Sequence, residues 1–88
     1  MLTIREAKVI AGRMLVEKYG YDFLRNNTKK ISSSVMKKDN NIVNIFFDLA
    51  EKDIDSYDDL FHMKGNEHFG EIIFSASVDL NNGEATAI

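Results

Sequence analysis

Residues 70–88, GEIIFSASVDLNNGEATAI, decide the fold, because they have the pattern of a β-hairpin. Apolar residues recur at every second position, and they alternate with Ile73, Ser75, Ser77 and Asp79. The apolar set is Ile72, Phe74, Ala76, Val78 and Leu80. This period of two predicts a strand with one buried face. Asn82 and Gly83 both tolerate a positive φ, so they predict the hairpin turn, and residues 84–88 return as the second strand.

A helix is predicted over residues 3–19. Thr3 and Glu6 have the spacing of a capping box, in which each side chain accepts a hydrogen bond from the backbone amide of the other. Gly20 is placed to end the helix. The apolar residues that share one helix face are Ile4, Ala7, Ile10, Ala11, Met14 and Leu15. Residues 21–27 are expected to be a connector, with Tyr21, Phe23 and Leu24 closing one end of the core.

Two further strands are predicted, over residues 29–37 and 42–49. Alternation places Val43, Ile45 and Phe47 on one face of the second strand, whereas the serine run at 32–34 is typical of an edge strand. Residues 50–69 form a long, irregular connection, and long connections often carry function. The expected fold class is α+β, a single domain over 1–88 with one N-terminal helix packed on a four-stranded antiparallel meander.

Length and composition narrow the setting of the protein. The chain has 88 residues and no cysteine, so it has neither disulfides nor thiolate metal sites. Charged residues interrupt the N-terminal stretch, which excludes a signal peptide there, and no run approaches the roughly 20 apolar residues of a membrane span. We therefore expect a cytoplasmic protein that makes no contact with a membrane.

Charge is divided unevenly along the chain. Residues 1–47 carry nine basic and four acidic side chains, whereas residues 48–88 carry two basic and ten acidic ones. Acidic residues are densest at 48–59, and a patch of this kind can steer a basic partner protein toward its binding site. With Tyr57 and Phe61 as aromatic anchors, the predicted partner-binding residues are Asp53, Asp55, Tyr57, Asp58, Asp59 and Phe61.

Enzymatic and cofactor chemistry have no support in the motifs. A calcium loop counted from Asp53 fails, because Asp58 stands at its glycine position and Lys64 at its final glutamate position. The grouping of His62, Glu67 and His68 has no helical zinc-binding spacing. There is no glycine-flanked nucleophile and no nucleotide-binding loop. We therefore expect no catalytic residues, no cofactor and no metal.

Nucleic-acid binding is not expected either. A basic set flanks the first predicted strand, but it lacks interleaved aromatic residues and the chain as a whole is acidic, with a pI near 5.2. These side chains are better explained as protection of an edge strand. The set comprises Arg25, Lys29, Lys30, Lys37 and Lys38.

A family resemblance rests on the helix end at Lys18-Tyr19-Gly20 and on the hairpin from Val78-Asp79 to Gly83-Glu84. With these features the chain resembles the small helix-plus-sheet domains of the PepSY and cystatin-like groups and the NTF2-fold immunity proteins. That resemblance implies a cystatin-like arrangement and non-enzymatic work, such as inhibition or immunity against a toxin.

The expected function is therefore that of a small binding protein that inhibits or neutralises a protein partner through its acidic segment. Two alternatives stay open. One is a homodimerising structural module that pairs through the edge strand 29–37 or through the sheet face bearing Ile42, Phe46 and Ile73. The other is a small-ligand-binding domain with a pocket between helix and sheet.

Overall fold

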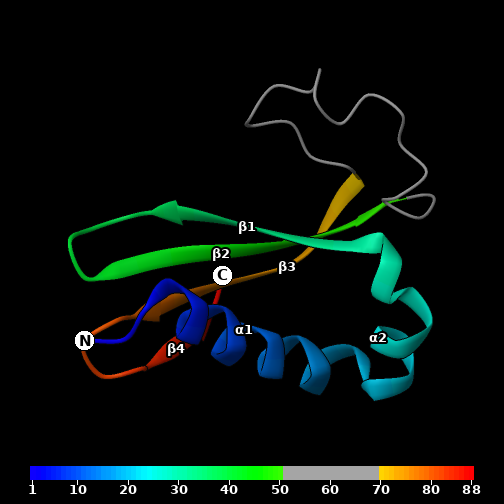
Figure 1. Cartoon of the computed structure of the whole chain (residues 1–88), viewed down its shortest axis with the longest axis horizontal. Coiled ribbons are helices and arrows are strands. Elements are labelled where there is room, and N and C mark those ends of the chain that lie inside the picture. Colours follow the sequence, from blue (N-terminus) through cyan, green and yellow to red (C-terminus); the bar gives the residue numbers. More distant parts are fainter. Residues whose placement is uncertain (51–69) are drawn as a thin grey trace.

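A computed structural model describes residues 1–50 and 70–88 and shows helices packed on a four-stranded antiparallel sheet (Figure 1). The strands lie side by side in chain order, β1-β2-β3-β4, which confirms the α+β class. The elements are α1 (Ile4–Tyr19), α2 (Tyr21–Asn27), the 3₁₀ turn η1 (Thr28–Lys30), β1 (Ile31–Lys37), β2 (Ile42–Ala50), β3 (Gly70–Asp79) and β4 (Ala85–Ala87).

Both ends of α1 follow the sequence signals. The Thr3 hydroxyl accepts a hydrogen bond from the Glu6 amide at 3.1 Å, and the Glu6 carboxylate accepts one from the Thr3 amide at 3.1 Å, so the capping box is confirmed. At the other end Gly20 has φ 89° and donates its N–H to the Val16 carbonyl at 2.7 Å. A positive φ is costly for residues with a Cβ, which explains why a glycine ends this helix.

The connector predicted over residues 21–27 is wrong, because this stretch forms the short helix α2. Its orientation also differs from the prediction. Tyr21 is 68% exposed and does not close the core, whereas Leu24 packs against it and the Phe23 ring stacks on Tyr19 with centroids 4.7 Å apart. Seven residues are too few to display helical periodicity, so this element gives little sequence signal.

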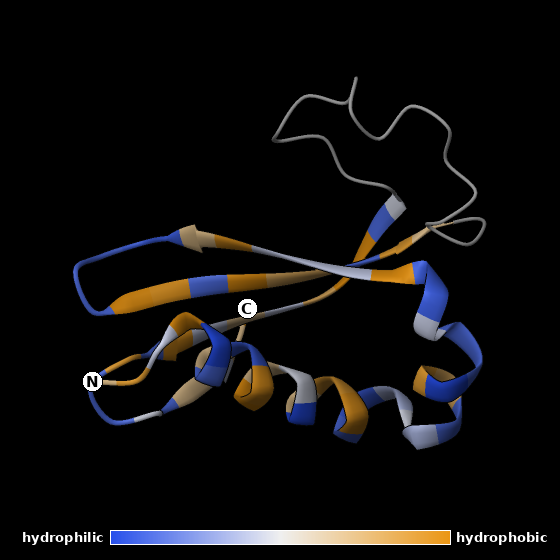
Figure 2. Cartoon of the chain, viewed as in Figure 1, coloured by the Kyte–Doolittle hydropathy of each residue, from blue (hydrophilic) through white to orange (hydrophobic). Residues whose placement is uncertain are grey.

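The core lies between α1 and one face of the sheet. From the helix side it is built by Ala7, Ala11 and Leu15, which are at most 1% exposed. Because two of these are alanines, the helix can lie close against the strands. The sheet contributes the apolar alternation that gives β2 and β3 their hydrophobic stretches in Figure 2; these residues are Val43, Ile45, Phe47, Phe74, Ala76, Val78 and Leu80.

A β-bulge changes which side chains of β3 point inward. Phe47 pairs with Phe74, but the next residue, Asp48, pairs with Ile72, so Ile73 is an extra residue in the ladder. The prediction that Ile72 belongs to the buried face is therefore wrong: Ile72 is 48% exposed, and Ile73 packs against the core beside Phe74. A bulge reverses the alternation on one side of itself, and strand sequence alone does not show this.

The hairpin turn is longer than the two-residue turn predicted at Asn82-Gly83. Asp79 donates its N–H to the Glu84 carbonyl at 2.8 Å, and Gly83 donates to the Asp79 carbonyl at 2.8 Å. Of the two predicted turn residues, only Gly83 has a positive φ, 76°, so Asn82 does not have the positive φ that the prediction allowed for it. Its side-chain oxygen accepts a hydrogen bond from the Glu84 amide at 2.9 Å.

Gly70 and Gly12 form a matched pair for a stability test. A Cβ at Gly70 would collide with the backbone carbonyl of Leu49, whereas a Cβ at Gly12 would meet nothing within 4 Å. We expect Gly70→Ala to reduce the free energy of unfolding by about 1–3 kcal/mol, the usual cost of overpacking. We expect Gly12→Ala to raise it by about 0.5–1 kcal/mol, because alanine is the better helix former. Urea unfolding measures the free energy of unfolding of both variants. A Gly70→Ala variant as stable as the unchanged protein would contradict the close approach of Gly70 to the Leu49 carbonyl.

Candidate functional site

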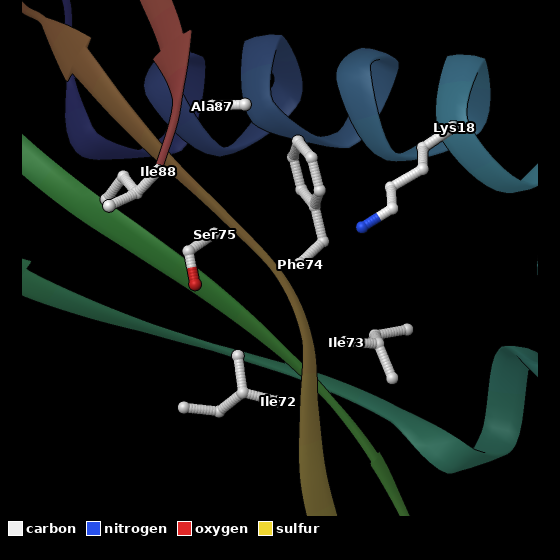
Figure 3. Close-up of a pocket in the computed structure, with 7 residues that line it drawn as sticks. All are labelled: Lys18, Ile72, Ile73, Phe74, Ser75, Ala87 and Ile88. Carbon is white, nitrogen blue, oxygen red and sulfur yellow. The ribbon is translucent and has the colours of Figure 1, made fainter.

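An open groove lies beside β3, where that strand continues past the end of β4 (Figure 3). Its volume is about 390 Å³. The groove is bounded by the last turn of α1, by β3 and by the end of the chain; its lining residues are Lys18, Ile72, Ile73, Phe74, Ser75, Ala87 and Ile88. These positions are far apart in the sequence, and the hairpin and the helix end bring them together.

Unequal strand lengths create the groove. β4 is in register only with residues 76–78 of β3, and one further hydrogen bond, from the Ile88 amide to the Ser75 carbonyl at 3.0 Å, ends this ladder. On its other side β3 pairs with β2 from Gly70 to Asp79, with Ile73 as the extra residue of the bulge. Residues 70–74 therefore have a strand neighbour on one side only, within the part of the chain that the structure describes.

The bulge gives the two sides of the groove different side chains. Figure 3 shows Ile73 and Phe74 on the same side of β3 as Lys18, and Ile72 on the opposite side with Ser75. Consecutive residues on one side are what the extra residue of a bulge produces. The groove thus offers apolar surface above and below the strand and an exposed length of backbone between.

Tyr19 fixes the helix end to this strand. Its hydroxyl donates a hydrogen bond to the Ile73 carbonyl at 2.7 Å, across 54 positions of sequence. The bond satisfies a carbonyl in the bulge and sets how close the last turn of α1 lies to β3.

Lys18 supplies the positive charge of the groove. Its Nζ lies 5.5 Å from the centroid of the Phe74 ring and 5.2 Å from that of Tyr19, within the range of cation–π contacts. The ammonium is exposed and points toward the space beside Ile73 and Phe74 (Figure 3). It can therefore pair with an anionic group that enters the groove.

The second face of the sheet is a separate surface that carries both apolar and polar side chains. Side chains that pair across the strands share a face, so Met36, Asn44 and Ser77 lie together, as do Phe46 and Ser75. This is the face opposite the core, and none of the described helices packs on it. Met36 is 61% exposed on this face, and the buried Oδ1 of Asn44 accepts no hydrogen bond from the described residues.

One part of the predicted dimer surface is wrong. Ile42 and Phe46 do lie on this second face, where both are half-buried, but the bulge turns Ile73 to the opposite face and into the core. The apolar residue that replaces it on the second face is Ile72.

All six predicted partner-binding residues lie outside the described residues, in 51–69. They are Asp53, Asp55, Tyr57, Asp58, Asp59 and Phe61, and the same holds for His62, Glu67 and His68. The acidic stretch was expected to begin at Asp48, which the structure places in β2 with 3% exposure. A side chain this buried cannot contribute to a surface patch, so the stretch that can do so begins after β2.

Chain connectivity locates the two ends of that stretch. Ala50 and Gly70 pair with each other at one end of the β2–β3 ladder, so segment 51–69 leaves and re-enters the sheet at the same place. Gly70 lies two residues from Ile72 in the groove. The acidic segment and the groove are therefore attached to the same end of β3.

The sequence prediction did not identify the groove residues. They come from the last turn of α1, from β3 and from residues 87–88, so no local pattern in the sequence brings them together.

Comparison with known proteins adds no family: no family model, curated protein or solved structure matches the chain. The resemblance to PepSY, cystatin-like and NTF2-fold immunity proteins therefore stays a prediction. Within the described residues, no helix is long and apolar enough to cross a membrane. Those residues also contain no group of three or more His, Cys, Asp or Glu side chains that could hold a metal ion.

Replacing Tyr19 tests the link between helix and groove. Tyr19→Phe removes the hydroxyl that donates to the Ile73 carbonyl and leaves the ring stacked on Phe23. We expect the free energy of unfolding to fall by about 0.5–1.5 kcal/mol, the usual contribution of one hydrogen bond. Tyr21→Phe is the control, since that exposed side chain should change stability by less than about 0.5 kcal/mol. Equal losses of stability for the two variants in thermal unfolding would contradict the hydrogen bond from the Tyr19 hydroxyl to the Ile73 carbonyl.

Proposed function

We propose that this protein is a small non-enzymatic binding protein that inhibits or neutralises a protein partner. The observation that carries the proposal is the apolar surface that the sheet leaves uncovered beside the groove. Ile72 and Ile88 line the groove and are 48% and 69% exposed, although the fold has a separate, well-buried core; Met36 is 61% exposed elsewhere on the same sheet face, on β1. Grouped apolar side chains on the outside of a folded domain commonly mark a binding surface.

The acidic segment would attract the partner to this end of the molecule. Segment 51–69 carries six acidic and two basic side chains and is attached where Ala50 pairs with Gly70. A basic partner would approach it faster than a neutral one, because opposite charges steer diffusional encounter. In this proposal Asp53, Asp55, Asp58 and Asp59 provide the charge, and two aromatic residues, Tyr57 and Phe61, provide anchors.

The setting that fits this proposal is the cytoplasm. The chain has no cysteine, which is compatible with a reducing compartment. Inhibition would follow from steric and electrostatic blocking of the partner, a mechanism that needs neither a cofactor nor a catalytic group.

A homodimer is the second candidate, and the uncovered sheet face favours it. Met36, Phe46 and Ile72 would be covered if the same face of a second copy packed against them, as in an isologous interface. The third class, a small-ligand-binding domain, has less support. The groove is open rather than enclosed, and the space between α1 and the sheet is filled by side chains that are almost fully buried.

Neutralising the acidic segment tests the proposed function. The change is Asp53→Asn, Asp55→Asn, Asp58→Asn and Asp59→Asn together, measured against a partner protein captured from the source cell. We expect the association rate at low salt to fall by about tenfold, with the dissociation rate little changed, because steering acts on encounter. Stopped-flow fluorescence over a range of salt concentrations measures both rates.

The control carries the same change in net charge elsewhere. It consists of four exposed residues of the described part of the chain: Glu17→Gln, Asp22→Asn, Asp39→Asn and Glu84→Gln. Equal rates for the two variants, with equal sensitivity to salt, would contradict the role of the acidic segment. A sedimentation mass that doubles with rising protein concentration would favour the homodimer instead.

A further inference from the structure

We propose that Asn82 is a site of spontaneous deamidation, and that the reaction proceeds only in molecules in which the turn from Asp79 to Glu84 has opened. The Gly83 nitrogen gives up its proton and forms a bond to the Asn82 Cγ, while the bond from Cγ to Nδ2 breaks and ammonia leaves with that proton. Water then opens the cyclic imide at either carbonyl, which leaves aspartate or isoaspartate at position 82. This reaction is independent of the proposed function.

The sequence singles out Asn82 among the asparagines of the chain. It is the only one that is followed by glycine. The following nitrogen has to approach the asparagine side chain, and glycine has no Cβ that would block this approach. The other asparagines are followed by Asn, Thr, Ile or Glu, whose side chains hinder it. Asn82 is also exposed, so water reaches its side chain.

Hydrogen bonds restrain both reacting groups in the closed turn. The Gly83 N–H donates to the Asp79 carbonyl at 2.8 Å, so the proton that must leave is engaged. The Asn82 Oδ1 accepts from the Glu84 amide at 2.9 Å, which fixes the side chain against the backbone beyond Gly83. Ring closure requires rotation of the Asn82 side chain and backbone toward the Gly83 nitrogen. The closed turn therefore protects the residue pair that the sequence makes reactive.

Neighbouring elements anchor this turn. The Leu80 carbonyl accepts from the Leu2 amide at 2.7 Å, and the Leu80 amide donates to the Asn41 carbonyl at 2.6 Å. A Cβ at Gly83 would lie 3.3 Å from the Leu2 Cδ1 and 3.6 Å from the Ile10 Cδ1, so the Gly83 backbone packs against the start of α1. Figure 1 shows the turn beside this end of the helix. Opening the turn thus breaks contacts with two other parts of the fold.

The deamidation rate should follow the population of the open turn. Folded proteins open locally, with free energies that depend on how many contacts are broken. Several hydrogen bonds and the packing on α1 close this turn, so its open form is a small fraction of the molecules. The rate at Asn82 is then the rate in an open chain multiplied by that fraction.

Isoaspartate would alter the hairpin itself. It carries the chain through Cβ and Cγ, which lengthens the backbone between β3 and β4. The Gly83 amide could not keep both its bond to Asp79 and its place against Leu2. We expect protein enriched in isoaspartate at position 82 to unfold at lower urea concentration than unmodified protein, and equal midpoints would contradict this effect.

Comparing folded with unfolded protein tests the proposal. The full-length chain is incubated in one buffer with and without guanidinium chloride, and peptide-mapping mass spectrometry follows deamidation at each asparagine. We expect Asn82 to react fastest in the unfolded chain and about tenfold or more slower in the folded protein. Asn82→Gln should abolish the reaction at this position, because the longer side chain would have to close a larger ring.

The role of the turn is tested by Asp79→Ala. The Asp79 carboxylate accepts from the Asn81 amide at 2.8 Å. Without this bond we expect deamidation of the folded protein to be about two- to tenfold faster, the factor that corresponds to one hydrogen bond. Asp79→Asn keeps an acceptor oxygen and should restore most of the protection. Asp22→Ala, which removes an exposed aspartate of α2, is the matched control and should leave the rate unchanged.

Hydrogen exchange at the Gly83 amide provides a second readout in the same variants. Exchange and deamidation require the same opening, so Asp79→Ala should accelerate both by the same factor. Faster exchange without faster deamidation would overturn the requirement for opening. Equal rates at Asn82 in folded and unfolded protein, or equal rates for Asp79→Ala and Asp22→Ala, would overturn the control by the turn. Faster reaction at another asparagine in the unfolded chain would overturn the choice of site.

Discussion

β3 lies between two strands of unequal length, and the rest of the structure depends on this constraint. All ten residues of β3 lie along β2, but only three pair with β4. The fully paired part carries Ala76 and Val78, which are completely buried under α1. The half-paired part carries the bulge at Ile73 and borders the groove. One strand thus builds the core with one half and exposes backbone with the other.

The last turn of α1 contacts the half-paired part of β3. Gly20 ends the helix directly after Lys18 and Tyr19. The Tyr19 hydroxyl donates a hydrogen bond to the Ile73 carbonyl in the bulge, and the Lys18 ammonium lies 5.5 Å from the centroid of the Phe74 ring. A longer helix would run past this edge, and a shorter one would leave the bulged carbonyl uncapped. The same local signal that stops the helix therefore shapes the candidate binding surface.

Much of the fold could be predicted from the sequence, because its signals are local. Thr3, Glu6 and Gly20 delimit the helix through hydrogen bonds within a few residues, and the alternation in β2 reports a strand with one buried face. The sequence could not show that Ile73 points into the core and Ile72 outward, since the register with β2 creates the bulge. The groove could not be predicted, because its lining residues come from the end of α1, from β3 and from residues 87–88. The acidic residues Asp53 to Asp59 were identified by composition, and their role stays a prediction.

The bulge turns Ile73 into the core and Ile72 outward. Comparing Ile73→Ala with Ile72→Ala by urea unfolding tests this. We expect Ile73→Ala to lower the free energy of unfolding by about 1–2 kcal/mol more than Ile72→Ala, because only Ile73 packs against the core. A larger loss for Ile72→Ala would show that the alternation continues unbroken through β3, and it would contradict both the bulge and the groove built on it.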